Sequence, residues 1–257
     1  MKKAMKLISN PVVFVVLNLI VYALYGILVG LSLFPSVLIV VAFAHIPVVT
    51  SFAHYALIAL GLGLGVFVFL ITGLLVFGLA ERLLTLGFKP GTYSTDSIVF
   101  MRWIINAGVH TLCLNMILPF LCGSSFIKVY FKIIGCKFGR DVFFNSPGLH
   151  DAYLLEMGDN VVIGGKADVN CHIFEGNRLI LDKVKIGSDV LIGAYSYIMP
   201  GVTIEDKCDV GAGSIIRKNR VIEAGSVTTP LPALPLRQTV TLMRIAKSGI
   251  KQNKVRR

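Results

Sequence analysis

An isoleucine or valine recurs at every sixth position in the second half of the chain. The series is Ile180, Ile186, Ile192, Ile198, Ile204, Val210, Ile216 and Ile222. A period of six fits neither an α-helix nor a single strand, but it suits a parallel β-helix whose coils stack like residues into internal ladders. The residues four positions later, from Val184 to Ser226, are mostly small or β-branched. We expect them at a second inward position. Glycine follows a ladder residue at Gly187, Gly193 and Gly211, where a corner is expected to need its backbone freedom.

The repeat extends towards the N-terminus with one irregularity. Three earlier ladder residues keep the register: Met157, Ile163 and Val169. Eleven residues then separate Val169 from Ile180, so about five of them, residues 175–179, are expected to leave the coil as a loop. An outlying match at Phe138 begins the repeat, which covers about residues 138–227. This length is enough for about five coils of three hexads each.

The first third of the chain is apolar. No Asp, Glu, Lys or Arg occurs between Leu7 and Ala80, a run several times longer than the ~20 residues that cross a bilayer once. The sequence therefore predicts an integral membrane protein, with spans near residues 11–31, 35–52 and 54–79. A fourth apolar stretch at 103–121 is either a last crossing or a helix in the interface.

We expect three regions. These are a transmembrane and interfacial helical domain of about four segments at 1–135, the β-helix at 136–230, and a basic C-terminal tail at 231–257. Basic clusters mark the region boundaries at Lys2, Lys3 and Lys6, at Lys128, Lys132, Lys137 and Arg140, and at Lys251, Lys254, Arg256 and Arg257. Positive flanks stay in the cytoplasm. Four crossings place all three clusters and the β-helix there, with Arg82, Lys89 and Arg102 outside, whereas three crossings would export the β-helix. We prefer four.

The net charge of +11 and the five cysteines restrict the partners. A nucleic-acid surface would interleave aromatic with basic residues, which this chain does not do. A basic belt that contacts anionic lipid fits better. The cysteines are odd in number and show no CxxC spacing, so the sequence predicts a reducing compartment without a disulfide framework or zinc site.

The most regular stretch, residues 186–217, reads IGSDVLIGAYSYIMPGVTIEDKCDVGAGSIIR. It closely resembles the hexapeptide-repeat acyltransferases in its Ile-Gly pairs, its Pro-Gly-Val step and its Gly-Ala-Gly-Ser run. Two departures are Leu191 for the usual Trp and Glu205 for a Gly. The resemblance implies a left-handed β-helix, a homotrimer, and acyl-coenzyme A bound in the clefts between neighbouring chains. It also implies a catalytic histidine placed before a loop that leaves the coil.

His172 occupies that position. An imidazole with an ordinary pKa of about 6.5 can take the proton of a hydroxyl or amine as it attacks a thioester. Glu175 could orient the imidazole through its second nitrogen, and a solvated loop carboxylate is an equal alternative. The resemblance similarly places Asn145 and Asp151, in the irregular first coil, among residues that hold the acceptor. The β-helix offers only His150 and His172, so a three-histidine metal site is not supplied.

Cofactor positions follow from the same resemblance. Ala194 and Ala212 match positions that line the pantetheine arm of coenzyme A, where small side chains let the arm lie close to the coil. Arg217 and Lys218 match the basic end of the motif and could pair with coenzyme phosphates, their alternative being a solvated face on the last coil. No metal is expected.

A narrower resemblance comes from LHDAYLLEMGDNVVIG and NCHIFEGNR. These segments look like the terminal membrane and β-helix region of poly-lysine-type nonribosomal peptide synthetases. The combined prediction is a membrane-anchored acyltransferase that moves an acetyl or other acyl group from coenzyme A to a hydroxyl or amine of a lipid-linked, glycan or peptide acceptor. The alternative is a catalytically silent β-helix that trimerises a membrane transport or binding protein. Acceptor, acyl length and pathway stay open.

Overall fold

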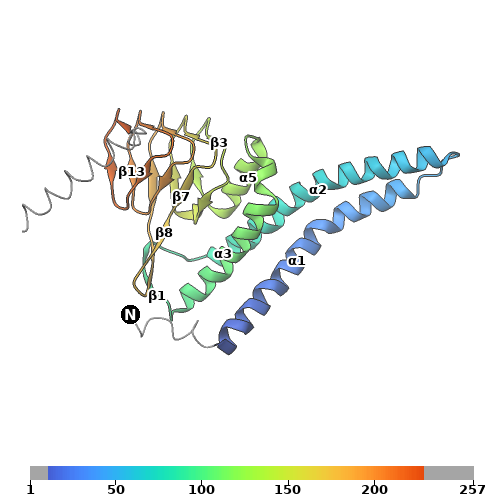
Figure 1. Ribbon diagram of the computed structural model, residues 1–257, viewed down its shortest axis with the longest axis horizontal. Coiled ribbons are helices and arrows are strands. Elements are labelled where there is room, and N and C mark those ends of the chain that lie inside the picture. The colour runs from blue at the N-terminus through green and yellow to red at the C-terminus, as the bar shows by residue number, and fades with distance from the viewer. Residues whose placement is uncertain (1–10, 229–257) are drawn as a thin grey trace, which may run out of the picture.

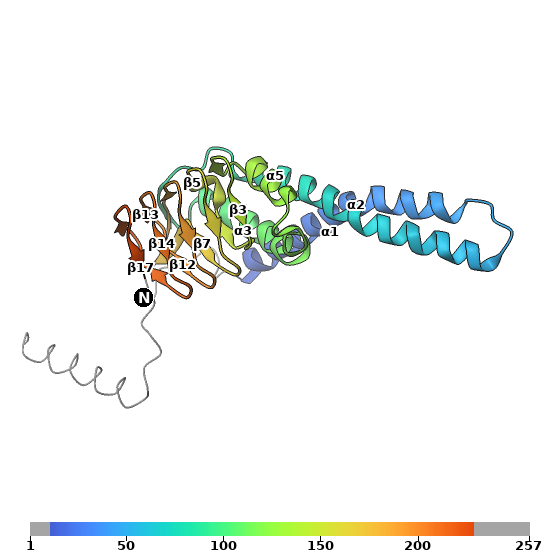
Figure 2. The same ribbon diagram turned by 90° about the horizontal axis from the view of Figure 1, so that it is seen from above.

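The computed structural model describes residues 11–228 as a set of helices followed by a parallel β-helix (Figure 1). Two long helices, α1 (Pro11–Ala44) and α2 (Ser51–Thr85), form an antiparallel hairpin. Figure 2 shows the closed end of this hairpin extending away from the rest of the chain. Three described helices are long and apolar enough to cross a membrane, α1, α2 and α3 (Ile98–Met116), with mean hydropathies of 2.6, 2.6 and 1.2. The predicted apolar helical region is therefore present.

The boundary predicted between spans 11–31 and 35–52 is wrong, because the continuous helix α1 runs through Pro35 to Ala44, and the rest of the second predicted span falls in the turn and at the start of α2. A proline removes one backbone donor from a helix, and in an apolar setting a neighbouring helix can compensate. Here the hydroxyl of Thr72 on α2 donates to the carbonyl of Ser32 at 2.7 Å. This hydrogen bond joins α1 to α2 close to the proline, one residue from the carbonyl of Leu31 that the proline leaves without its helical donor.

The chain between the hairpin and the β-helix forms one strand and three helices. They are β1 (Gly91–Ser94), α3 (Ile98–Met116), α4 (Leu118–Leu121) and α5 (Ser125–Ile134). The fourth apolar stretch predicted at 103–121 is thus divided between α3 and α4, with a proline in the first turn of α4 that restricts the residue before it. Helix α5 ends at Gly135, whose φ of 101° turns the chain into the β-helix.

Three parallel sheets form the sides of the β-helix. The first contains β2 (Lys137–Phe138), β5 (Leu155–Met157), β10 (Val184–Ile186), β13 (Thr203–Ile204) and β16 (Val221–Ile222). The second contains β3 (Phe143–Phe144), β6 (Val162–Ile163), β11 (Leu191–Ile192), β14 (Asp209–Val210) and β17 (Val227–Thr228). The third contains β4 (Leu149–His150), β7 (Asp168–Asn170), β12 (Tyr197–Ile198) and β15 (Ile215–Ile216). A short 3₁₀ turn, Ala152–Leu154, follows β4.

The ladders follow the predicted register. Residues eighteen apart, one coil of three hexads, pair in neighbouring strands, as Ile186 does with Ile204 and Ile192 with Val210. The ladder residues from Ile186 to Ile216 are buried, and so are the second inward positions from Val184 to Ser214. Arg220, at the next such position on the last coil, is exposed, because an unpaired guanidinium is too costly to bury. The domain is a left-handed parallel β-helix of the hexapeptide type.

The glycines after the ladder residues have a different role from the one predicted. Positive φ angles fall three residues after the ladder position instead, for example at Asp189 and Tyr195. A Cβ at Gly193 would lie 2.6 Å from the carbonyl oxygen of Val210 in the next coil, and one at Gly187 would lie 2.7 Å from the backbone nitrogen of Asp206. These glycines are required by the close stacking of coils and not by corner freedom.

The excursion from the coil is larger than predicted. Seventeen residues separate Val169 from Ile186 where one hexad would take six, so eleven residues leave the coil. They form a hairpin of β8 (His172–Glu175) and β9 (Arg178–Leu181), and β1 adds an antiparallel third strand. Ile180 therefore is not a ladder residue but pairs with Thr92 and Ile173. Its hexad match is a coincidence of spacing.

Candidate active site

His172 and Asp151 form a side-chain pair where the chain leaves the third sheet. Strand β4 pairs with β7 so that His150 lies beside Asn170, and the residues that follow each strand come together at the same corner. Asp151 has a φ of 54°, which turns the chain after β4. The Nδ1 atom of His172 lies 2.5 Å from the Oδ2 atom of Asp151. The carboxylate therefore orients the imidazole and leaves Nε2 for other chemistry.

The Asp151 carboxylate is held by two more donors. The Trp103 indole N–H donates to its Oδ1 atom at 3.0 Å and the Tyr153 hydroxyl donates to the same atom at 2.9 Å. Burial pushes the pKa of Asp151 upward, but the hydrogen bond and charge of His172 and the two donors outweigh it, so the pKa lies below its ordinary value. Asp151 is ionised at neutral pH and can stabilise an imidazolium.

Aromatic rings enclose one side of the pair. The Trp103 ring meets the His172 ring edge to face at 4.8 Å between centroids, and Phe174 lies 5.3 Å from Trp103. The side chain of His172 is 23% exposed while that of Asp151 is 4% exposed. The imidazole is thus accessible to a reactant, whereas the carboxylate behind it is shielded from water.

His150 lies on the other side, with its ring 6.3 Å from that of His172. Burial, followed by the neighbouring His110 and His172, lowers the pKa of His150 to about 4. His150 is therefore neutral at physiological pH and adds no positive charge beside the imidazole of His172.

Glu175 does not contact the imidazole. Its carboxylate pairs with the ammonium of Lys218 on the last coil, and both side chains are more than two-fifths exposed. The predicted orienting carboxylate is Asp151 instead, because the antiparallel register of β8 and β9 pairs Glu175 with Arg178 at the end of the hairpin and away from the dyad. Lys218, predicted to bind phosphate, is in this pair.

The other predicted positions lie at a different corner. Asn145, Ala194 and Ala212 each follow a strand of the second sheet. A Cβ at Gly164 would meet the backbone nitrogen of Ala194 at 2.6 Å, so the corners stack closely along one edge. Within one chain the structure therefore brings Asp151 to His172, but it does not bring Asn145 there.

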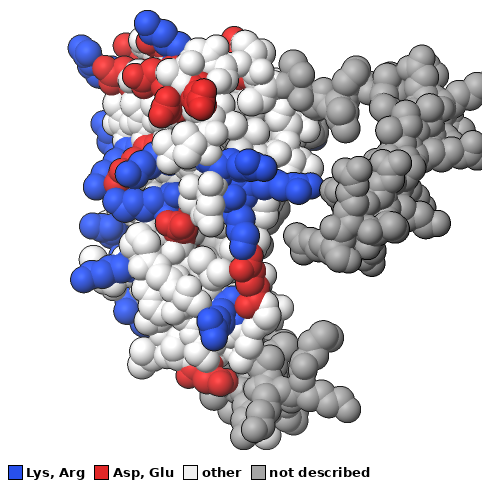
Figure 3. Space-filling view, turned by 90° about the vertical axis from the view of Figure 1, so that its left-hand side faces the viewer, with Lys and Arg blue, Asp and Glu red and all other residues white. Residues whose placement is uncertain are grey.

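The basic end of the motif lies on the last described coil. Arg217, Lys218 and Arg220 are all exposed there. Figure 3 looks at this end of the molecule and shows Lys and Arg side chains across the middle of the face. Such a surface can receive phosphate groups, for which guanidinium and ammonium are the usual partners.

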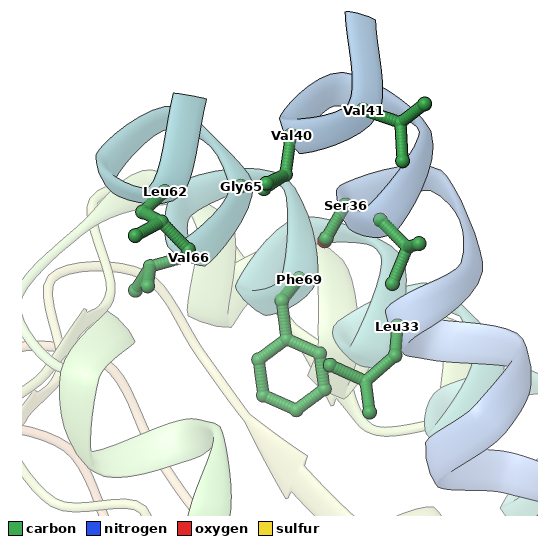
Figure 4. Close-up of a pocket in the computed structure, with 9 residues that line it drawn as sticks. Leu33, Ser36, Val40, Val41, Leu62, Gly65, Val66 and Phe69 are labelled. Carbon is green, nitrogen blue, oxygen red and sulfur yellow. The ribbon is translucent and has the colours of Figure 1, made fainter. Parts of the chain in front are cut away.

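Three other observations bear on possible sites. A cavity of about 340 Å³ between α1 and α2 is lined by apolar side chains and by Ser36, without any titratable group (Figure 4). The cavity offers no acid or base.

Cys171, next to His172 in sequence, is fully buried, and burial raises its pKa well above the ordinary value. It is therefore not poised as a nucleophile. Among the described residues, no group of three or more His, Cys, Asp or Glu could hold a metal ion.

Sequence reasoning missed Trp103 and Tyr153. Trp103 is the single tryptophan of the 257 residues and lies in an apolar helix, where a core role is the ordinary interpretation. Tyr153 lies two residues after Asp151, in the irregular coil. The only available signal was its proximity to Asp151, and no hexad position describes that segment.

The chain is similar to several known proteins. Residues 183–218 match the family described as bacterial transferase hexapeptide, six repeats. A delta-poly-L-ornithine synthetase of Acinetobacter baumannii is 27% identical over 176 residues, covering 68% of this chain and 13% of that protein. The galactoside O-acetyltransferase of Escherichia coli is 33% identical over 98 residues, covering 34% of this chain and 48% of that protein. The chain thus spans less than half the length of either relative.

A solved structure of a galactoside acetyltransferase in complex with coenzyme A is 22% identical. The match covers 62% of this chain and 79% of that chain, with a TM-score of 0.36.

Proposed function

We propose that this protein, whose β-helix domain belongs to the hexapeptide-repeat transferase family, is a membrane-anchored acyltransferase that uses an acyl-coenzyme A donor. The observation that carries the proposal is the pairing of His172 with Asp151 at the point where the chain leaves the coil. A partly exposed imidazole with a buried carboxylate on its second nitrogen is the arrangement that a general base requires.

The transfer requires one base and no covalent enzyme intermediate. Nε2 of His172 accepts the proton of the acceptor hydroxyl or amine while the acceptor oxygen or nitrogen attacks the thioester carbonyl. The tetrahedral intermediate then collapses, the carbon–sulfur bond breaks, and the imidazolium returns the proton to the departing thiolate. The products are the acylated acceptor and coenzyme A. Asp151 stabilises the imidazolium throughout, because its carboxylate stays ionised.

Donor binding is proposed at the edge formed by Ala194 and Ala212, with Arg217 and Lys218 near the phosphates. In one chain this edge and His172 lie at different corners, so a homotrimer would join the edge of one chain to the histidine of its neighbour. Exposed apolar side chains support such an assembly, since Phe143, Val162 and Leu191 stack on the outward face of the second sheet. An oligomer would remove this face from water. Asn145 lies on the same edge and would help to hold the acceptor.

We propose that α1 and α2 cross the membrane as a hairpin and that the β-helix lies on the cytoplasmic face. The closed end of the hairpin, residues 45–50, carries no Lys or Arg. A two-span arrangement places the open end, including Arg82, Lys89 and Arg102, on the same side as the basic N-terminal segment. This removes the charge conflict of a four-span topology, because positive residues then gather on one side. Helix α3 would lie along the β-helix instead of crossing.

The anchor favours an amphiphilic acceptor. A site fixed at the membrane surface raises the effective concentration of a lipid-linked sugar, glycolipid or lipid-linked peptide relative to a freely diffusing molecule. The basic residues of the open end would hold the domain against anionic lipid.

The test compares the full chain in detergent or lipid discs with its His172→Ala variant. Acetyl-coenzyme A binding should be similar in both, and slow hydrolysis or transfer to added glycolipids should occur only in the wild type. His45→Ala, an exposed histidine at the closed end of the hairpin, is the matched control and should behave as wild type. Absence of coenzyme A binding in all three proteins would reject the assignment in favour of a silent trimerisation scaffold.

A further inference from the structure

We propose that Trp103, from helix α3 of the helical domain, is a positioning residue of the transfer site that holds Asp151 where it orients His172. This inference rests on the proposed function and adds to it that the β-helix alone does not form the complete site. The residue lies 48 positions from Asp151 in sequence, in the region that the repeat does not cover.

The two carboxylate oxygens of Asp151 make separate contacts. Oδ2 faces the Nδ1 atom of His172 at 2.5 Å. Oδ1 accepts the Trp103 indole N–H at 3.0 Å and the Tyr153 hydroxyl at 2.9 Å. The two donors therefore hold the carboxylate oxygen that does not face the imidazole. Because the Asp151 side chain is only 4% exposed, water cannot readily replace a lost donor.

Trp103 also restrains the imidazole directly. Its ring centroid lies 4.8 Å from that of His172 at an interplanar angle of 63°, an edge-to-face contact. The same indole thus contacts both members of the pair, the carboxylate through its N–H and the imidazole through its ring.

Helix α3 is capped at its start and held against the end of α2. The Ser97 hydroxyl accepts from the backbone N–H of Phe100 at the start of the helix. The Arg102 guanidinium donates to the carbonyls of Leu84 and Leu86 at 2.7 and 2.9 Å, which joins α3 to the end of α2. These contacts determine where the indole lies.

A buried carboxylate of α2 that contacts α3 further along adds another restraint. Glu81 of α2, which is 3% exposed, contacts His110 of α3 at 3.1 Å and accepts a hydrogen bond from the Tyr130 hydroxyl of α5. Three helices are thereby joined at one residue, and α5 leads directly into β2. The placement of Trp103 at the site is consequently a property of the whole helical domain.

The first experiment removes only the N–H. Because Trp103 is the only tryptophan, growth of a tryptophan auxotroph on the benzothiophene analogue, in which sulfur replaces the indole N–H, changes this position alone. 5-Fluorotryptophan, which keeps the donor, is the matched control. We expect the sulfur analogue to lower kcat about tenfold, on the scale of one lost hydrogen bond to a charged group, with KM for acetyl-coenzyme A changed less than about twofold.

The pH profile separates positioning from packing. Both donors lower the pKa of Asp151, so the loss of one raises it, and the acid limb of kcat/KM should move to higher pH in the sulfur analogue and in Tyr153→Phe. The 5-fluorotryptophan protein should keep the wild-type profile. An unchanged kcat and an unchanged profile in the sulfur analogue would overturn the proposal and leave Trp103 as a packing residue.

The second experiment does not depend on activity. An imidazolium in contact with an indole quenches its fluorescence, so acidification should lower the emission of Trp103 in the wild-type protein in one step. The step should be absent in His172→Gln and altered in Asp151→Asn, which removes the carboxylate that contacts both rings. Identical curves in all three proteins would show that the indole does not contact this pair. If the step is present but no transfer is found with any acceptor, the positioning contact holds and the proposed reaction fails.

Discussion

Asp151 and His172 meet at 2.5 Å although 21 residues separate them, because one coil of the β-helix brings the end of β4 beside the end of β7. The pair consists of a carboxylate shielded from water and an imidazole that remains partly exposed. Such an asymmetry suits a base whose charge is stabilised from behind while its free nitrogen meets the reactant.

Replacement of Asp151 by Asn should reduce kcat by about 100-fold or more, because an amide cannot stabilise the imidazolium and can hold the wrong tautomer. Binding of acetyl-coenzyme A should change little. Steady-state kinetics of the full chain measure both quantities. Asp141→Asn, at a corner with a φ of 57° that Asn tolerates, is the control. A kcat within threefold of wild type for Asp151→Asn would contradict the assigned role.

Separate effects are expected for the two members of the Glu175–Lys218 pair. Glu175→Gln should leave kcat within about twofold, since the carboxylate contacts Lys218 and the pair is exposed. Lys218→Ala should raise KM for acetyl-coenzyme A several-fold if its ammonium serves the phosphates. Measuring KM for coenzyme analogues with and without the 3′-phosphate identifies the group concerned. A large loss of kcat in Glu175→Gln would restore the orienting role first predicted for that residue.

The depressed pKa of His150, about 4, predicts an acid-sensitive domain. The unfolded chain binds a proton at this residue below pH ~6.5, whereas the folded chain does so only near pH 4. Stability should therefore fall as pH drops through this window, by about 3 kcal/mol at most, and then level off. Thermal unfolding of His150→Gln should show a flatter pH dependence than wild type, and the exposed-site variant His45→Gln should not. Parallel curves for wild type and His150→Gln would refute the prediction.

Close stacking of coils predicts a sharp contrast between two glycines. Gly193→Ala would place a Cβ 2.6 Å from the carbonyl of Val210, a backbone contact that cannot move aside, so the domain should lose several kcal/mol or fail to fold. Gly213 has a φ of 73° and open space around it, so Gly213→Ala should cost only about 1–2 kcal/mol. The midpoint of thermal unfolding compares the two. Equal losses would argue against stacking as the reason for Gly193.

The two-span topology can be tested by labelling with a membrane-impermeant maleimide. Val49→Cys, at the closed end of the hairpin and fully exposed, should react in intact cells. Asp189→Cys, at an exposed corner of the β-helix, should react only after permeabilisation. The unmodified chain gives the background from its own cysteines, of which four of five are buried. Labelling of both variants in intact cells would place the β-helix outside.

Much of the fold could be predicted from local patterns. Each hexad buries its ladder residue in the same way, so the period of six was visible without knowledge of the partner coil. The match at Ile180 was misleading for the same reason: an apolar residue at the right spacing is equally useful in a hairpin that packs against β1. Pro35 was misleading because α1 continues through it while packed against α2, which a local pattern does not show.

The site was only partly readable. His172 could be identified because the excursion interrupts a regular repeat, and Asp151 because it lies in an irregular coil. The choice between Asp151 and Glu175 as the orienting carboxylate depends on the register of two separate pairings, β4 with β7 and β8 with β9. Trp103 and Tyr153 could not be assigned, because their roles depend on where their side chains point in the folded chain, which no spacing in the sequence reveals.

The sequence by itself determined the β-helix and the apolar helices. Stacked like residues recur at a fixed spacing, and segments that suit a bilayer are long apolar runs, so both features are visible along the chain. Only the tertiary structure decided which side chains meet at His172. The helical domain contributes Trp103, the first coil contributes Asp151, and the hairpin directs Glu175 towards Lys218. These contacts join residues far apart in the chain, so their energies depend on how the two domains pack and not on the residues nearby in sequence.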